Sequence, residues 1–201
     1  QQASAPTKCN IERCKQKLFM EEPINLPNRQ SHRYKGYDYS TAGAYFVTFC
    51  VRGGQCIFGH VMNNEMIAND AANTVQNCWY NLPKRFPTIA LDEFRVMPNH
   101  VHLIVWLQAN PENVKTSGAA SSAPTLGQVL RAFKSITAIE ANRCLGRSGQ
   151  LWQRNYWDRI VRDEIELENY RNYIRTNPAR WEKDQLHPNA PPNQFNRWEQ
   201  L

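Results

Sequence analysis

This sequence lacks the segments that mark a membrane or secreted protein. No run approaches the ~18 to 20 consecutive apolar residues of a membrane-spanning helix. The first residues do not show the charged and then apolar pattern of a secretion signal. No internal repeat is visible either. We therefore expect neither a membrane span nor a signal peptide.

The cysteines do not have the spacing of a zinc ribbon or zinc finger. Cys9 and Cys14 lie close together, but no second close pair completes such a site. Cys50 stands in an apolar strand-like run and Cys78 in a helical one, where cysteine behaves as a small buried hydrophobe. We expect reduced thiols, as in a cytosolic protein.

Length and composition indicate one globular protein with a moderately basic surface. The 201 residues are 41% hydrophobic and 21% charged, and the formal net charge is +6. Residues 1–52 and 126–180 each carry a net charge of +4, whereas 53–125 and 181–201 each carry −1. If both basic blocks fold onto one face, they would form a groove for a phosphate backbone. Charge scattered over the surface explains the composition equally well.

Hydrophobic periodicity predicts an α+β domain. Apolar runs predict strands and apolar residues three or four apart predict helices. The order is typical of a ferredoxin-like (RRM-like) antiparallel sheet with helices packed on one face. We expect an irregular basic N-terminal arm at 1–40, the domain at 41–181 and a C-terminal tail at 182–201. The predicted strands are 45–51, 57–62, 89–97 and 100–106, and the predicted helices are 69–85, 126–145 and 163–177.

Two histidines stand inside one of these apolar strands. His100 and His102 are two residues apart, so their imidazoles project from the same face. Neutral imidazole is a good ligand for divalent metals. A His-x-His pair alone is more often an ordinary core or surface feature. Here a buried polar ring needs a partner, which favours a functional site.

The last predicted helix carries a second polar pair. Tyr173 and Asn177 are four residues apart and share a face, beside an apolar stripe that would dock the helix on the sheet. Tyr173 alone could be a core tyrosine, and Asn177 before Pro178 could be a helix stop.

Together these elements resemble a known family. The segment Val96-Met-Pro-Asn-His-Val-His-Leu-Ile104, followed downstream by Tyr173-Ile-Arg-Thr-Asn-Pro178, is similar to the single-tyrosine HUH transposases. It resembles the REP-associated tyrosine transposases most closely, from about Arg33 to Trp181. The residue between the histidines, Val101, is hydrophobic, as that pattern requires. The proline-broken arm and the Ala/Ser/Pro-rich loop at 109–124 depart from the family.

The resemblance implies an HUH nuclease fold and a role for each of the two histidines, the tyrosine and the asparagine. His100 and His102 would be metal ligands, Asn177 the third ligand and Tyr173 the catalytic nucleophile. The mixed nitrogen and oxygen ligands favour Mg²⁺ or Mn²⁺. The implied activity is a metal-dependent single-stranded DNA endonuclease and strand transferase, cutting at or near palindromic hairpins through a 5′-phosphotyrosine intermediate. The implied partner is single-stranded or hairpin DNA in a bacterial-type, nucleoid-associated cytoplasmic protein, monomeric or homodimeric.

Basic and aromatic residues are candidates for DNA binding. Cations would track phosphates, and aromatic rings would stack on bases or else pack in the core. The arm residues would read a guide sequence beside the hairpin. The candidates are Arg131, Lys134, Arg154, Arg159, Arg162, Arg171 and Arg175; Trp152, Tyr156 and Trp157; and, in the arm, Arg29, Arg33 and Lys35.

Two other functions compete with this one. A relaxase or replication initiator is less favoured, because the short chain shows no helicase or second domain. A non-catalytic DNA or RNA hairpin-binding module with an RRM-like sheet is the alternative from a different class. The first strand lacks the aromatic pattern usual in such modules, whereas each position of the catalytic motif is filled.

Overall fold

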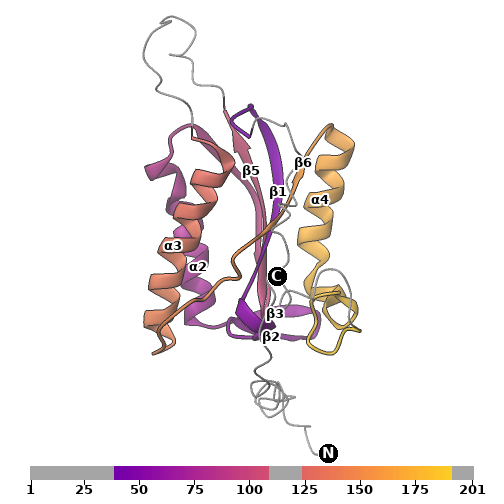
Figure 1. Ribbon diagram of the computed structural model, residues 1–201. Helices are drawn as coiled ribbons and strands as arrows, with labels where there is room; N and C mark the ends of the chain where they lie inside the picture. Colours follow the sequence, from indigo (N-terminus) through magenta and orange to yellow (C-terminus); the bar gives the residue numbers. More distant parts are fainter. Residues whose placement is uncertain (1–38, 109–123, 192–201) are drawn as a thin grey trace, which may run out of the picture. The chain divides into compact units, whose positions relative to one another are not determined.

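The computed structural model describes residues 39–108 and 124–191, which form a four-stranded antiparallel sheet with helices on both sides (Figure 1). The strand order is β4-β5-β1-β6. Along the chain, strands and helices follow the β-α-β-β-α-β order of a ferredoxin-like domain. The predicted α+β, ferredoxin-like class is therefore confirmed. These elements are β1 (Gly43–Cys50), α2 (Asp70–Arg85), β4 (Ile89–Val96), β5 (His100–Leu107), α3 (Leu126–Cys144) and β6 (Trp157–Ile160).

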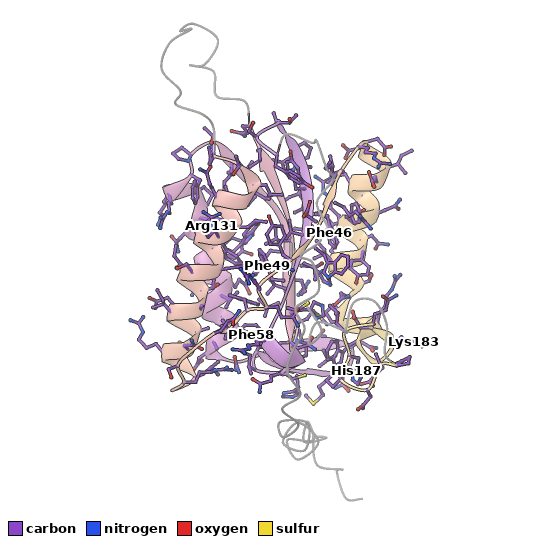
Figure 2. The ribbon with its side chains drawn as sticks, viewed as in Figure 1. Phe46, Phe49, Phe58, Arg131, Lys183 and His187 are labelled. Atoms are coloured by element: carbon purple, nitrogen blue, oxygen red, sulfur yellow. The ribbon has the colours of Figure 1, made fainter. Side chains whose placement is uncertain are left out.

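The sheet separates two layers of helices. Helices α2 and α3 cover one face, and α4 (Glu164–Thr176) lies over the opposite face (Figure 1). The prediction that the helices pack on one face therefore holds for α2 and α3 but was wrong for α4. Strand β1 is apolar on both faces, and this explains the arrangement. Phe49 packs in the core beneath α2 and α3, and Phe46 packs against α4 (Figure 2).

Side-chain caps fix where the three main helices begin. Asn69 accepts a hydrogen bond from the Ala72 amide at the start of α2. Thr125 and Gln128 form a capping box at the start of α3. Asp163 accepts a 2.8 Å bond from the Glu166 amide before α4. Because capping is a local interaction, the predicted helix bounds agree closely with those observed.

Two short strands, β3 (Glu65–Ala68) and β6, were not predicted. The predicted strand 57–62 is observed as β2 (Gly59–Met62), and it pairs with β3 in a hairpin. Its turn residues Asn63 and Asn64 both have positive φ, as a two-residue hairpin turn requires. Strand β6 is the fourth strand of the sheet and pairs with β1 at the edge. It has four residues, two of them charged, so it lacks a strand-like pattern.

The folded region continues beyond the predicted domain end at 181. A 3-10 helix, η3 (Pro178–Lys183), follows α4, and Asp184 after it is buried. Asn99 Nδ2 donates to the backbone oxygen of Leu186 at 2.7 Å, which ties this segment to the start of β5. The first ten residues of the predicted tail are thus described, and part of them packs against the sheet. The arm, apart from Tyr39 and Ser40, lies outside the described residues, as does most of the 109–124 loop.

Two smaller predictions also concern the described residues. Cys50 is buried in β1 and Cys78 half-buried in α2, and neither forms a disulfide. Within 39–108 and 124–191, no helix has the length and apolar character needed to cross a membrane.

Candidate metal and tyrosine site

The two histidines lie at the start of β5. His100 and His102 alternate with Val101, so both rings lie on the α4 face of the sheet. They are almost completely buried, at 0% and 2% exposure. Their Nε2 atoms are 3.0 Å apart. The alternation of side chains along β5 thus brings two imidazole nitrogens close together.

Asn99 fixes the protonation of His100. Its Nδ2 donates to the backbone oxygens of Gly54 at 3.2 Å and Leu186 at 2.7 Å. The remaining amide atom, Oδ1, can only accept, and it lies 2.8 Å from His100 Nδ1. His100 therefore carries its proton on Nδ1, and its Nε2 presents a lone pair to His102.

Thr48 on β1 has the corresponding position beside His102. Its Oγ1 lies 2.8 Å from His102 Nδ1, and a hydroxyl can donate to or accept from that nitrogen. If Thr48 donates to Nδ1, His102 carries its proton on Nε2 and can donate it to His100. If Thr48 accepts from Nδ1 instead, both Nε2 lone pairs become available to one cation.

Asp184 completes a group that the sequence did not reveal. His100, His102 and Asp184 are all buried, and their potential ligand atoms lie within 4.8 Å of one another. Asp184 Oδ2 accepts a 3.0 Å hydrogen bond from Asn177 Nδ2. Asp184 lies in what was predicted as a tail, and a single acid in a polar, proline-rich segment carries no distinguishing pattern.

Asn177 also lies at this site, at the C-terminal end of α4. It is buried, and its Oδ1 has no hydrogen-bond partner among the described residues. A buried unpartnered amide oxygen is costly, so it points to a missing cation or donor. Two imidazole nitrogens, a carboxylate and this oxygen form a donor set that fits a divalent cation.

The site holds both histidines neutral. Burial lowers the pKa of His100 to about 3, although the interaction with Asn177 opposes this shift. Burial and the neighbouring His100 lower the pKa of His102 well below its usual value, and Asp184 opposes that shift. A metal ligand must be unprotonated, so both rings are in the form that binds a cation.

Tyr173 is packed against the same group. Its ring centroid is 5.1 Å from that of His102, and it meets Phe46 edge-on at 6.0 Å. Burial, followed by the Asp184 charge, raises the pKa of Tyr173 to about 12, and Arg180 and Asn177 act in the opposite direction. At neutral pH the hydroxyl therefore keeps its proton. A cation beside Asp184 would remove one of the two main causes of this shift.

The exposed arginines among the DNA-binding candidates are on two sides of the sheet. Arg131 lies on α3, across the sheet from α4 (Figure 2). Arg159 is exposed on β6, where it is the cross-strand neighbour of Phe46 and so belongs to the α4 side. Arg162 follows β6, and Arg154 precedes it. The basic block 126–180 therefore does not gather on one face.

Lys134 and Trp152 have structural partners instead of exposed positions. Lys134 Nζ donates to the backbone oxygens of Gln153, of Arg154 at 3.1 Å and of Asn155 at 3.4 Å. Trp152 is 3% exposed, and its Nε1 donates to Thr137 Oγ1 at 2.8 Å. Trp152 has no free face for base stacking, so the core alternative holds for it. Tyr156 and Trp157 are half-buried, and Tyr156 packs edge-on against Phe49.

Arg171 and Arg175 are paired with carboxylates of β4. Arg171 Nε and Nη2 lie 2.9 and 2.8 Å from the two oxygens of Asp92. Arg175 Nε is 2.7 Å from Glu93 Oε1. Neither guanidinium is a free surface cation. The arm candidates Arg29, Arg33 and Lys35 lie outside the described residues.

Two Haemophilus influenzae proteins have sequences similar to that of this chain. No family model matches it. A Haemophilus influenzae protein named "Uncharacterized protein" is 37% identical over 171 residues, covering 81% of this chain and 94% of the relative. A second protein of that organism, named "Putative REP-associated tyrosine transposase", is 24% identical over 145 residues, covering 71% of this chain and 74% of the relative.

Two solved structures are also similar. A REP-associated tyrosine transposase bound to a REP hairpin aligns with 15% identity and a TM-score of 0.48, over 75% of this chain and 74% of that one. A "putative transposase" from Deinococcus radiodurans aligns with 15% identity and a TM-score of 0.43, over 72% of this chain and 96% of that one. The chain belongs to the same family as the first Haemophilus influenzae protein, and it is a relative of the REP-associated tyrosine transposases.

Proposed function

We propose that the chain is a transposase-like enzyme that cuts and rejoins single-stranded DNA at or near hairpins, through a covalent bond to Tyr173. One observation carries this proposal: Tyr173 packs at 5.1 Å from the ring of His102, beside the buried His100–His102–Asp184 group. A tyrosine hydroxyl next to a cation site is the arrangement that phosphodiester transfer needs. The relationship to REP-associated tyrosine transposases supports the same chemistry.

The chemical step exchanges one phosphodiester for another. The Tyr173 oxygen attacks the phosphorus, a phosphorus–oxygen bond forms to tyrosine, and the bond to the 3′ oxygen of the departing strand breaks. The phenolic proton is released, and the departing 3′ oxygen takes up a proton to become a hydroxyl. No oxidant or external energy source is needed, because the bond energy is kept in the 5′-phosphotyrosine. A second 3′-hydroxyl can reverse the step and join a different strand.

The site residues would hold the cation and orient the nucleophile. His100, His102, Asp184 and the Asn177 amide oxygen would be the ligands, with Mg²⁺ or Mn²⁺ as the cation. A bound divalent cation would neutralise charge on the scissile phosphate. Asn99 and Thr48 would keep the imidazole nitrogens directed at it.

The DNA would approach from the α4 side of the sheet. Arg159 and Arg162 are exposed there, and their charges lower the pKa of Tyr170 against the stronger effects of burial and Glu166. We propose these two arginines, with Arg154, as phosphate contacts. Trp157 is the aromatic candidate for base stacking in the same segment. The family resemblance points to imperfect palindromic hairpins as the substrate.

Covalent capture tests the function directly. Purified protein is incubated with labelled hairpin oligonucleotides carrying single-stranded flanks, with Mn²⁺ or Mg²⁺, and denatured adducts are separated by size. Wild type should form an adduct that chelation prevents, and Tyr173→Phe should form none. Tyr170→Phe is a matched control on the same helix and should keep the adduct. An adduct that persists in Tyr173→Phe would exclude this nucleophile. Hairpin binding without any adduct would favour the non-catalytic binding module.

A further inference from the structure

Strand β4 has an irregularity directly beneath α4. Leu91 pairs with Val105 and Phe94 with Leu103, so Asp92 and Glu93 both stand opposite one residue of β5. This is a β-bulge. In a regular strand, neighbouring side chains point to opposite faces, and a bulge changes the direction of one of them. Here it allows two consecutive carboxylates to reach the same helix.

Both carboxylates bind arginines of α4. Asp92 accepts from Arg171 through both oxygens, at 2.9 and 2.8 Å, a bidentate pairing. Glu93 Oε1 lies 2.7 Å from Arg175 Nε and 2.6 Å from its Nη2. Since the arginines are four residues apart, they project from one flank of the helix. Two pairs on one flank restrain the helix against rolling about its axis.

The Arg171–Asp92 pair is the more buried of the two. The Arg171 side chain is 24% exposed and that of Asp92 12%, so water screens this pair only partly. Trp106 Nε1 donates to Asp92 Oδ2 at 2.9 Å and fixes the carboxylate from the β5 side. Glu164 and Glu168 also lie within 3.5 Å of Arg171 Nη1. The arginine is therefore surrounded by acids, which disfavours an additional phosphate.

Tyr173 lies on the other flank of the same helix. At ~100° per residue it is about 200° around the axis from Arg171. A roll of about 20° at a side-chain radius of ~5 to 6 Å would move a terminal atom by about 2 Å. Displacements of about 1 Å can cost on the order of 10²-fold in rate. The roll angle of α4 therefore decides whether Tyr173 reaches the phosphate.

We propose that Arg171 and Asp92 are positioning residues, which set the roll of α4 and so direct Tyr173 to the His100–His102–Asp184 group. This inference rests on the proposed function, since it assigns a role in the same reaction. It also changes the interpretation of Arg171, from a DNA contact to a restraint within the protein. The bulge at Asp92 and Glu93 is the backbone feature that makes the restraint possible.

Two variants that break the pair from opposite sides test the inference. In Asp92→Asn and Arg171→Gln, the single-turnover rate of adduct formation at saturating DNA should fall about 10- to 100-fold. The dissociation constant for the hairpin should stay within about threefold of wild type. Amide exchange in α4 should be faster in both variants, while exchange in α2 is unchanged. Arg143→Gln is the control, because Arg143 pairs with Glu140 within α3 and should match wild type.

The outcomes separate the possible explanations. If Arg171→Gln weakens hairpin binding while Asp92→Asn does not slow the reaction, Arg171 is a DNA contact and the inference is overturned. Unchanged exchange in α4 would overturn it whatever the activity. If wild type itself forms no adduct, the proposed function fails instead, and exchange still reports whether the pair restrains the helix. Arg171→Lys keeps the charge but not the bidentate geometry, so it should remain slower than wild type.

Discussion

Replacing Asp184 by asparagine removes the one negative charge of the proposed cation site with little change in shape. Asp184 Oδ1 accepts from the Leu186 amide at 2.7 Å, and the asparagine carbonyl can keep that bond. Asp184 Oδ2 accepts from Asn177 Nδ2 at 3.0 Å, where the new amide would present a donor. Asn177 can respond by rotating its own amide, because its Oδ1 has no partner among the described residues. The fold should therefore survive this substitution.

The expected loss is in metal affinity. Removing a residue that only supports a ligand typically costs 10- to 100-fold in metal binding. Asp184 is placed as a direct, charged ligand, so we expect at least about 100-fold weaker Mn²⁺ binding, or ~2.7 kcal/mol. Titration calorimetry with Mn²⁺ measures this, and thermal unfolding without metal checks the fold.

Glu182→Gln is the matched control for this substitution. Glu182 is in the same segment, and its side chain is 86% exposed. Its variant should bind Mn²⁺ as wild type does. Equal affinities for wild type and Asp184→Asn, with both folded, would refute the assignment. A larger loss in Asn177→Ala than in Asp184→Asn would instead make Asn177 the dominant oxygen ligand.

The first of two further predictions concerns Asn99 at the site, and the second concerns Lys134 on α3, across the sheet from it. Asn99→Ala removes the hydrogen bond to His100 and those to Gly54 and Leu186, so Mn²⁺ affinity by calorimetry should fall about 10- to 100-fold. An unchanged affinity would mean that His100 needs no support. Burial lowers the pKa of Lys134 to about 8, although its carbonyl partners favour the charged form. Between pH 8 and 10.5 the unfolded chain then holds a proton that the folded chain has released, so the free energy of unfolding should rise with pH, by at most about 1.4 kcal/mol per unit. Urea titrations over this range should show a steeper rise in wild type than in Lys134→Met; equal slopes would contradict the burial effect.

Local features were predictable from the sequence because local physics determines them. Alternation along β5 places His100 and His102 on one face, and the structure brings their Nε2 atoms to 3.0 Å. Capping by Asp163 fixes the start of α4, and with it the phase at which Tyr173 and Asn177 approach the sheet. Neither feature depends on which distant segment packs nearby.

The rest of the site depends on contacts between distant segments. Asp184 reaches the histidines only because η3 turns the chain back after α4, and Trp181 packs 6.0 Å from the His100 ring. Asn99 stands between the strands predicted at 89–97 and 100–106, but it bonds to Leu186, 87 residues away. The edge strand β6 pairs through its backbone with β1, and two of its four residues are charged. No periodicity within these segments encodes such partners.

The same dependence limits what can be inferred from charge. The block 126–180 carries a net charge of +4, which suggests a continuous surface for a phosphate backbone. In the fold, Arg171 is bound to Asp92, Lys134 is turned onto backbone oxygens, and Arg131 is on the helix layer across the sheet from α4. Arg159 and Arg162 remain exposed on the α4 side. In the proposed enzyme, Arg171 would restrain α4 through Asp92 and so position Tyr173, rather than bind the DNA.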